Sequence, residues 1–407
     1  LRFGAKMSKG GPVTRFAHGP YENDGKTVLC YSPDGRHIIT GGADNFVRVF
    51  DASKIDSQLR EIDHRETAVT AIAIAEQGDT FVTGGADNVA ALFKWDSCEY
   101  EGNATRAQTS VHDVVFNPSG AFLAVACDDG HIRHVCPATN DATILKGHTD
   151  AVLHLAYDPR GKFLASSSAD GNFRIWDMSG AGECVLTTPH GYGKHSEHPS
   201  APTWHPGEGR QLAVPGPRGV KLLERNSWQV SSTVGGGAQC LCAFSSSGQY
   251  LAVSGIDFNL LVWDLHKNQD IAKFKSSSLL SSLAWSPTHN SLAFARLDGH
   301  IAVWDKVVPE HMPHPVLATH AEAKKLDALD AVDGEDEDAL EAALNAAIGD
   351  ADADPSDLPT AKTSAKPVAK SALPRRRLQQ GMGEDGEDDV DDMEGLESKE
   401  AKEAPPP

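Results

Sequence analysis

Residues 146–177 read KGHTDAVLHLAYDPRGKFLASSSADGNFRIWD. A Gly-His pair precedes an apolar run, the turn Asp158-Pro159-Arg160-Gly161 and a second apolar run. An Asp-Gly turn then leads into a third run that ends in Trp176-Asp177. Short runs of alternating apolar residues are typical of β-strands, and Pro, Gly and Asp mark the turns between them. The stretch therefore predicts a set of short strands joined by tight turns.

The same pattern recurs along the chain at a nearly constant interval. The slot that Pro159 fills is repeated at Pro33, Glu76, Pro118, Pro206, Ser246 and Pro287, with successive intervals of 43, 42, 41, 47, 40 and 41 residues. Eleven residues after each slot lies an Asp in six of the seven repeats: Asp44, Asp87, Asp129, Asp170, Asp257 and Asp298. The fifth repeat has Pro217 there instead. A period of about 40–45 residues is that of a four-stranded WD40 blade.

These repeats predict an all-β fold, a seven-bladed WD40 β-propeller over residues 1–308. The seventh repeat supplies only three strands before Trp304-Asp305. Residues 13–17, which alternate apolar and polar side chains, are expected to provide its missing fourth strand. Closing the ring in this way leaves no long free strand edge.

In the quoted stretch, four side chains are expected to tie the strands together. By resemblance to WD40 proteins in general, His148 reaches Asp170, and Ser166 or Ser168 together with Trp176 completes a hydrogen-bonded tetrad. Only the fourth repeat carries every part. We interpret these residues, and the Asp of each turn, as structural braces rather than as catalytic groups.

No motif in the body indicates enzyme chemistry, so we expect neither an enzyme nor a bound cofactor. There is no phosphate-binding glycine loop. The histidine-rich segment is the one candidate metal site, but its ligand spacing is irregular and no Cys supports it, so no metal is expected; its members are His190, His195, His198 and His205.

The seven cysteines form no CxxC pair, which favours reduced thiols. Cys240 and Cys242 alternate on one expected strand and should therefore face the same way, as small buried apolar groups. The apolar runs are all too short to span a membrane.

Residues 309–407 differ sharply in composition from the body. They hold 25 Asp and Glu against 10 Lys and Arg, whereas every Phe, Trp and Tyr lies at or before Trp304. Such a segment cannot bury enough apolar surface to offset the entropy lost on ordering. We therefore expect a mostly disordered acidic tail.

Two segments of the tail carry a pattern. In residues 339–348, Leu340, Leu344 and Ile348 recur every four positions, which places them on one face of a short helix. This helix either binds a partner's groove or forms only transiently, because ten residues are too few for a stable helix in water. Residues 366–377 form a basic cluster that suits nuclear import; its charged members are Lys366, Lys370, Arg375, Arg376 and Arg377.

The fifth repeat carries a more specific resemblance. It reads Trp204-His205-Pro206, then QLAVP at 211–215, VKLL at 220–223 and Arg225-Asn226-Ser227-Trp228. This order resembles the corresponding blade of the acidic nucleoplasmic DNA-binding protein family, also called WD repeat and HMG-box DNA-binding proteins and, in yeast, chromosome transmission fidelity factor four. The similarity covers roughly residues 13–308, and the acidic tail with its basic cluster is similar too.

The resemblance implies a non-enzymatic nuclear adaptor of the DNA replication fork. That family couples the replicative helicase to DNA polymerase alpha and supports sister-chromatid cohesion, and its association with chromatin would here be indirect. Its full-length members trimerise through a segment that would follow the tail, so the chain is expected to be a fragment and monomeric by itself.

Two alternatives remain at this point. One is a WD40 scaffold of another nuclear complex, for chromatin or RNA processing. The other is a substrate receptor of a ubiquitin ligase, many of which carry Arg two places after a Trp-Asp pair. Here the pairs are followed by Met178-Ser179, Leu265-His266 and Lys306-Val307.

Overall fold

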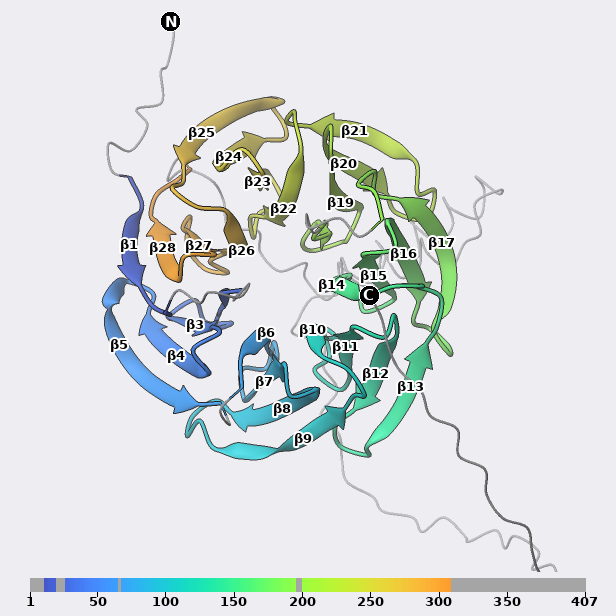
Figure 1. The fold of residues 1–407 in the computed structure, drawn as a ribbon. Coiled ribbons are helices and arrows are strands. Elements are labelled where there is room, and N and C mark those ends of the chain that lie inside the picture. Colours follow the sequence, from blue (N-terminus) through green and yellow to red (C-terminus); the bar gives the residue numbers. More distant parts are fainter. Residues whose placement is uncertain (1–10, 20–25, 65–66, 195–199, 309–407) are drawn as a thin grey trace, which may run out of the picture. The chain divides into compact units, whose positions relative to one another are not determined.

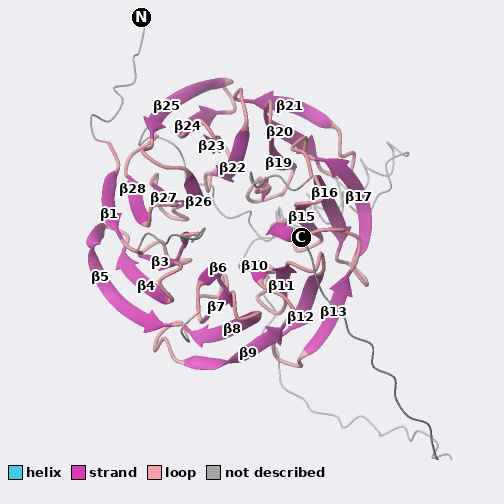
Figure 2. Cartoon of the chain, in the orientation of Figure 1, coloured by secondary structure: helices cyan, strands magenta, loops and turns pink. Residues whose placement is uncertain are grey.

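The computed structural model describes residues 11–19, 26–64, 67–194 and 200–308. These residues form twenty-eight strands in seven four-stranded antiparallel sheets, and no helix is found among them. The sheets follow one another around a ring (Figure 1), and every regular element in Figure 2 is a strand. The predicted seven-bladed β-propeller is confirmed. The predicted disordered tail, the segment 339–348 and the basic cluster 366–377 lie outside the described residues.

Each blade contains four strands, from the innermost to the outermost. Blades one and two are β2 (Val28–Tyr31), β3 (His37–Gly41), β4 (Phe46–Asp51), β5 (Lys54–Asp63), β6 (Val69–Ile74), β7 (Thr80–Gly85), β8 (Val89–Lys94) and β9 (Tyr100–Arg106). Blades three and four are β10 (Val111–Phe116), β11 (Leu123–Cys127), β12 (Ile132–Cys136), β13 (Asp141–Leu145), β14 (Val152–Tyr157), β15 (Phe163–Ser168), β16 (Asn172–Asp177) and β17 (Glu183–Pro189). Blades five and six are β18 (Thr203–Trp204), β19 (Gln211–Gly216), β20 (Gly219–Glu224), β21 (Val230–Val234), β22 (Gln239–Phe244), β23 (Tyr250–Gly255), β24 (Asn259–Asp264) and β25 (Gln269–Lys275).

Blade seven joins the two ends of the propeller. It consists of β26 (Leu280–Trp285), β27 (Leu292–Arg296), β28 (His300–Trp304) and, as the outermost strand, β1 (Val13–Phe16). β1 runs antiparallel to β28, with Val13 opposite Val303 and Phe16 opposite His300. The strand expected at residues 13–17 therefore lies where closure requires it, one residue shorter than expected (Figure 1).

The apolar core lies between blades rather than inside each sheet. Successive side chains of a strand point to opposite faces. Ile38 of β3 accordingly packs with Ile301 and Val303 of blade seven, whereas the next residue, Ile39, packs with Phe81 of blade two. Each sheet thus shares both faces with its neighbours, so the blades stabilise one another.

The turn between the second and third strands has the same geometry in six blades. The recurring turn Asp accepts a hydrogen bond at its Oδ1 atom from the backbone N–H two residues later, at distances of 2.9–3.4 Å. Such side-chain-to-backbone bonds stabilise tight turns. The acceptors are Asp44, Asp87, Asp129, Asp170, Asp257 and Asp298.

Cys240 and Cys242 do not face the same way, so that prediction is wrong. The register of β22 shifts between Gln239 and Leu241, which makes Cys240 the extra residue of a β-bulge. Cys240 consequently packs with blade seven and Cys242 with blade five. Both are buried, and burial raises the pKa of the Cys240 thiol to about 11 and that of Cys242 further. Neither thiol is suited to redox chemistry.

Candidate functional site

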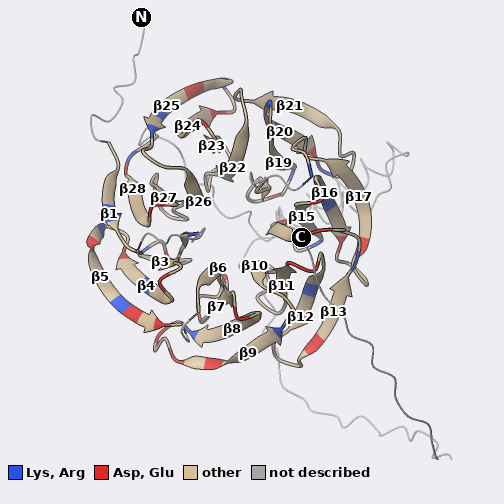
Figure 3. Ribbon diagram, in the orientation of Figure 1, with Lys and Arg blue, Asp and Glu red and all other residues tan. Residues whose placement is uncertain are grey.

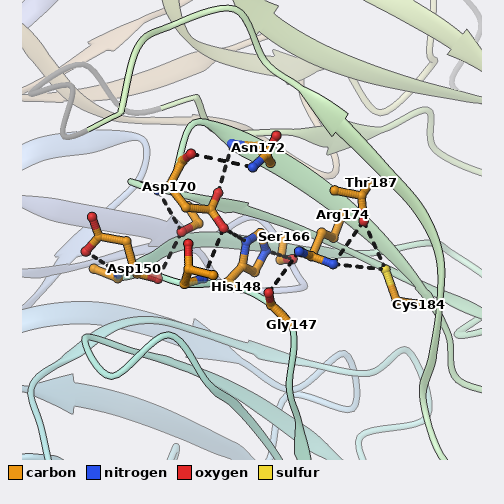
Figure 4. A network of polar contacts seen from close by, with 12 residues as sticks. Gly147, His148, Asp150, Ser166, Asp170, Asn172, Arg174, Cys184 and Thr187 are labelled. Atoms are coloured by element: carbon orange, nitrogen blue, oxygen red, sulfur yellow. Dashed lines mark hydrogen bonds and ion pairs between the residues drawn. The ribbon is translucent and has the colours of Figure 1, made fainter.

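The tetrad of blade four is assembled from a loop, two strands and a turn (Figure 4). His148 Nδ1 lies 2.9 Å from Asp170 Oδ2, and His148 Nε2 lies 2.8 Å from Ser166 Oγ. The indole N–H of Trp176 donates to the same Ser166 Oγ at 2.9 Å. Of the two serines considered, Ser166 joins the tetrad. The Oγ of Ser168 instead donates to Asp150 O at 2.9 Å and accepts the Asp170 N–H at 3.1 Å.

This arrangement is a brace and not a catalytic centre. The indole can only donate and the carboxylate can only accept, which orients Ser166 as donor to His148 Nε2 and His148 Nδ1–H as donor to Asp170. All four side chains are buried, and Ser166 has no exposed surface. Burial lowers the pKa of His148 despite its carboxylate partner. Burial alone would raise the pKa of Asp170, but hydrogen bonds from His148 and the Asn172 N–H hold it below its usual range.

Two further histidines brace their blades, and both were missed from the sequence. His18 lies 2.7 Å from Asp44 Oδ1 through Nδ1 and 2.8 Å from Thr40 Oγ1 through Nε2. His64 Nε2 lies 2.7 Å from Thr83 Oγ1 in blade two. The available signal was spacing, because each of these histidines, like His148, precedes its turn Asp by 22 to 26 residues.

At two other turns, an arginine and a histidine both contact the turn Asp, with His131 3.3 Å from Asp129 and His300 3.1 Å from Asp298. In blade three, Arg133 Nη2 lies 2.6 Å from Asp129 Oδ2. In blade seven, Arg296 Nε lies 3.1 Å from Asp298 Oδ1, and its Nη1 donates to Ser277 Oγ at 2.8 Å. These guanidinium groups hold the turn carboxylates by charge-assisted hydrogen bonds.

Blade five is joined to blade four by Trp204, Arg225 and Trp228, the residues on which the family resemblance of this blade rests. The Trp204 indole donates to Ala156 O of blade four at 3.0 Å. The Trp228 ring meets Phe163 of blade four edge-on at 5.1 Å between centroids, and Arg225 lies over the same Phe163 ring at 4.9 Å. Arg225 Nη1 also lies 2.5 Å from Oδ2 of Asp158, which has no exposed surface. These residues therefore form the joint between blades four and five.

The innermost strands of the seven blades surround a cavity of about 1880 Å³. Near one side of it, Lys26 of blade one crosses to blade three and donates to His112 O at 3.2 Å. Burial lowers the pKa of Lys26, and the nearby Asp113 carboxylate opposes that shift. His154 of blade four lies 3.7 Å from the same Asp113. Lys26, Asp113 and His154 thus lie together at this side of the cavity.

Of the histidine-rich segment, the structure describes His190 and His205, and each contacts a different backbone carbonyl. His190 Nε2 lies 3.1 Å from Ser168 O, and His205 Nδ1 lies 2.7 Å from Pro206 O. His195 and His198 lie outside the described residues. In the described part of the chain, no group of three or more His, Cys, Asp or Glu is placed to hold a metal ion. A search of the same residues finds no helix of the length and apolarity that a membrane span needs.

Comparison with known proteins places this propeller in a family. The family model described as the WDHD1 first WD40 domain matches residues 15–303. The chain is 27% identical over 312 residues to the mouse WD repeat and HMG-box DNA-binding protein 1, which covers 72% of the chain and 26% of that relative. The Xenopus laevis protein of the same name is 27% identical over 329 residues, which cover 77% of the chain and 28% of that relative. The Schizosaccharomyces pombe minichromosome loss protein 1 is 25% identical over 306 residues, which cover 73% of the chain and 36% of that relative.

The chain thus spans only about a quarter to a third of the length of these relatives. Within it, the match extends from β1 to β28 and includes the joint between blades four and five. Its buried braces, among them the tetrad of blade four, hold the strands of the fold together. The chain belongs to the WDHD1 family, with a WD40 scaffold that corresponds to the family's first WD40 domain.

Proposed function

We propose that the chain is a non-enzymatic adaptor of the DNA replication fork, which helps to couple the replicative helicase to DNA polymerase alpha and supports sister-chromatid cohesion. The observation that supports this proposal is the family match over residues 15–303. Two relatives are named as DNA-binding and one as a minichromosome loss protein, names that point toward chromosome maintenance.

The geometry favours an adaptor over an enzyme. The polar side chains that could suggest catalysis are held in braces, as His18, His64 and His148 are with their Asp, Thr or Ser partners. Charged side chains of both signs lie on several outer strands, and Figure 3 shows Lys or Arg beside Asp or Glu on β5 and β25. A rim of this kind provides surfaces for proteins at several points. Contact with chromatin then runs through those proteins.

Purification from replicating cells tests the proposal. The endogenous gene is tagged at its N-terminus, and the co-purifying proteins are identified by mass spectrometry. We expect helicase subunits and DNA polymerase alpha, and we expect them to persist after nuclease treatment because the link to chromatin is indirect. Recovery of cullin-ligase subunits or of RNA-processing factors in their place would overturn the replication role and favour one of the other scaffold functions.

The proposed nuclear location has its own test. Replacing Arg375, Arg376 and Arg377 with Ala should leave a fluorescent fusion in the cytoplasm, because import receptors read a basic cluster. Replacing Lys324 and Lys325 with Ala is the matched control, since it removes another basic pair of the same tail. Equal nuclear fluorescence in both variants would exclude import through residues 375–377.

A further inference from the structure

The turns of blades six and seven depart from the other blades. The residue before the turn Asp is small or polar in the first four blades, namely Ala43, Ala86, Asp128 and Ala169. In blades six and seven it is Ile256 and Leu297, whose side chains are 37% and 43% exposed. Exposed large apolar residues are informative where several lie together on the surface.

Phe258 is a stronger departure, because its backbone is in the left-handed region with φ at 62°. The equivalent residues are Asn45, Asn88, Gly130, Gly171 and Gly299, all of which also have positive φ. Asn and Gly tolerate this conformation, whereas a bulky aromatic residue is strained in it. Phe258 is also 38% exposed. A strained and exposed aromatic residue indicates a role outside the fold itself.

The two turns are linked through the segment 276–279, which hydrogen-bonds to both of them. The Ser276 N–H donates to Phe258 O at 2.8 Å, and three residues later Leu279 O accepts the Leu297 N–H at 3.0 Å. Leu279 is itself half-buried. We call the four side chains the blade 6–7 patch; they are Ile256, Phe258, Leu279 and Leu297.

Charges of both signs flank this patch. Lys275 pairs with Asn259 in the sheet, next to Phe258, and Lys273 lies two residues before it; both are exposed, and Figure 3 shows the basic end of β25 there. Asp298 is held by Arg296, and Asp257 accepts the Asn259 N–H. The outer edge of the patch is therefore basic. An apolar ligand with acidic residues at one end is complementary to it.

We propose that the blade 6–7 patch docks residues 335–348 of this same chain. That segment begins with Glu335, Asp336, Glu337 and Asp338 and continues with Leu340, Leu344 and Ile348 at one-face helical spacing. It is too short to be a stable helix alone and needs a surface to fold on. Its acids would face the lysines of β25, and its apolar residues would cover Phe258.

The connection is long enough for this contact. The described chain ends at Val308, and the residues from there to Leu340 can span about 100 Å at roughly 3.3 Å per residue. A six-residue strand is only about 20 Å long. Tethering of this kind gives a millimolar effective concentration. For a contact with a Kd of about 0.1 mM, the docked state would then outnumber the undocked state about tenfold.

Hydrogen exchange of the full 407-residue chain, followed by mass spectrometry, tests the contact. Peptides covering 335–348 should exchange about tenfold more slowly than the same synthetic peptide free in solution. The variant Phe258→Asn should abolish this protection, and Leu340→Ser with Leu344→Ser should speed exchange at residues 256–258 and 296–298. Asn already occupies the equivalent turn position in blades one and two, so Phe258→Asn should fold.

Val230→Thr is the matched control, because Val230 is 51% exposed and lies on β21 of blade five, outside the patch. It should leave the protection unchanged. Exchange of 335–348 at the free-peptide rate in the full chain would overturn the proposal. Protection that grows with protein concentration would also overturn it, because a second copy and not the same chain would then be the occupant.

Discussion

Blades four and five are neighbours that are held together by opposite means. Blade four binds its own strands through the tetrad of His148, Asp170, Ser166 and Trp176. Blade five has Pro217 at the turn position where blade four has Asp170, and its innermost strand is only Thr203–Trp204. Polar side chains of blade five instead reach its neighbour, since Arg225 and Trp204 both bond residues of blade four.

Blade five is also tied to its other neighbour. Ala201 forms an isolated parallel bridge with Leu241 of blade six, and its N–H donates to Cys240 O at 2.9 Å. The comparison teaches that a blade can lose its internal brace if the joints on both sides hold it. In a ring, where each sheet shares its core with two neighbours, within-blade and between-blade contacts are interchangeable sources of stability.

The largest expected effect is on the internal brace. Trp176→Ala should lower the free energy of unfolding by about 3–5 kcal/mol, because it empties a buried site and removes the indole donor to Ser166. Urea denaturation of the full chain measures it. Trp176→Phe keeps most of the ring and should cost only about 1 kcal/mol, since Phe50 and Phe93 end the corresponding strands of blades one and two. Equal losses for the two variants would contradict the brace.

The joint between blades four and five should give the next largest effect. Arg225→Met keeps an apolar stem over Phe163 but removes the charged hydrogen bond to the buried Asp158, at a cost of about 1.5–3 kcal/mol. Adding Asp158→Asn should recover part of this loss, because the carboxylate is then no longer buried and unpaired. Arg218→Met, at an exposed position of the same blade, is the control. A strictly additive double variant would show that the pair does not hold the joint.

The repeat and its turns could be predicted because they depend on local sequence. Pro and Asp recur at a fixed offset, and each turn Asp acts on a backbone group only two residues away. The contacts between blades could not be predicted in the same way. Arg225 and Asp158 are 67 residues apart and Lys26 and His112 are 86 apart. Nothing in the sequence marks such pairs until the ring has brought the blades together.

The remaining misses have the same origin. Because of the β-bulge at Cys240, its side chain lies on the face opposite to the one that simple alternation predicts. The residue type at that position does not indicate a bulge. His18 lies just beyond β1, so its pairing with Asp44 exists only because β1 closes the ring beside blade one. The strand β1, predicted for ring closure, therefore also positions His18 to brace Asp44. The alternation of residues within a strand does not predict such a contact.

The smallest effect, and the one that sharpens the comparison, is pH dependence. Folding lowers the pKa of His148 below its usual value of 6.5, so the unfolded chain binds the proton more readily. Stability contributed by neutral His148 is complete above pH 6.5 and is lost as pH falls below it, by at most about 1.4 kcal/mol per pH unit. Asp170 acts in a lower window, because hydrogen bonds hold its pKa below its usual value of 3.8.

Urea midpoints at pH 7.5 and pH 5 separate the two windows. His148→Asn should reduce the loss of stability on acidification, since the substituted side chain does not titrate. Burial lowers the pKa of His205 in blade five as well, but its described hydrogen bonds are to the backbone of Pro206 and Gly248, and it belongs to no tetrad. His205→Asn should therefore cost less at pH 7.5 than His148→Asn while reducing the acid loss in the same direction. If His148→Asn leaves the pH dependence unchanged, His148 has the same pKa in the folded and the unfolded chain, and the lowering of its pKa by burial is wrong.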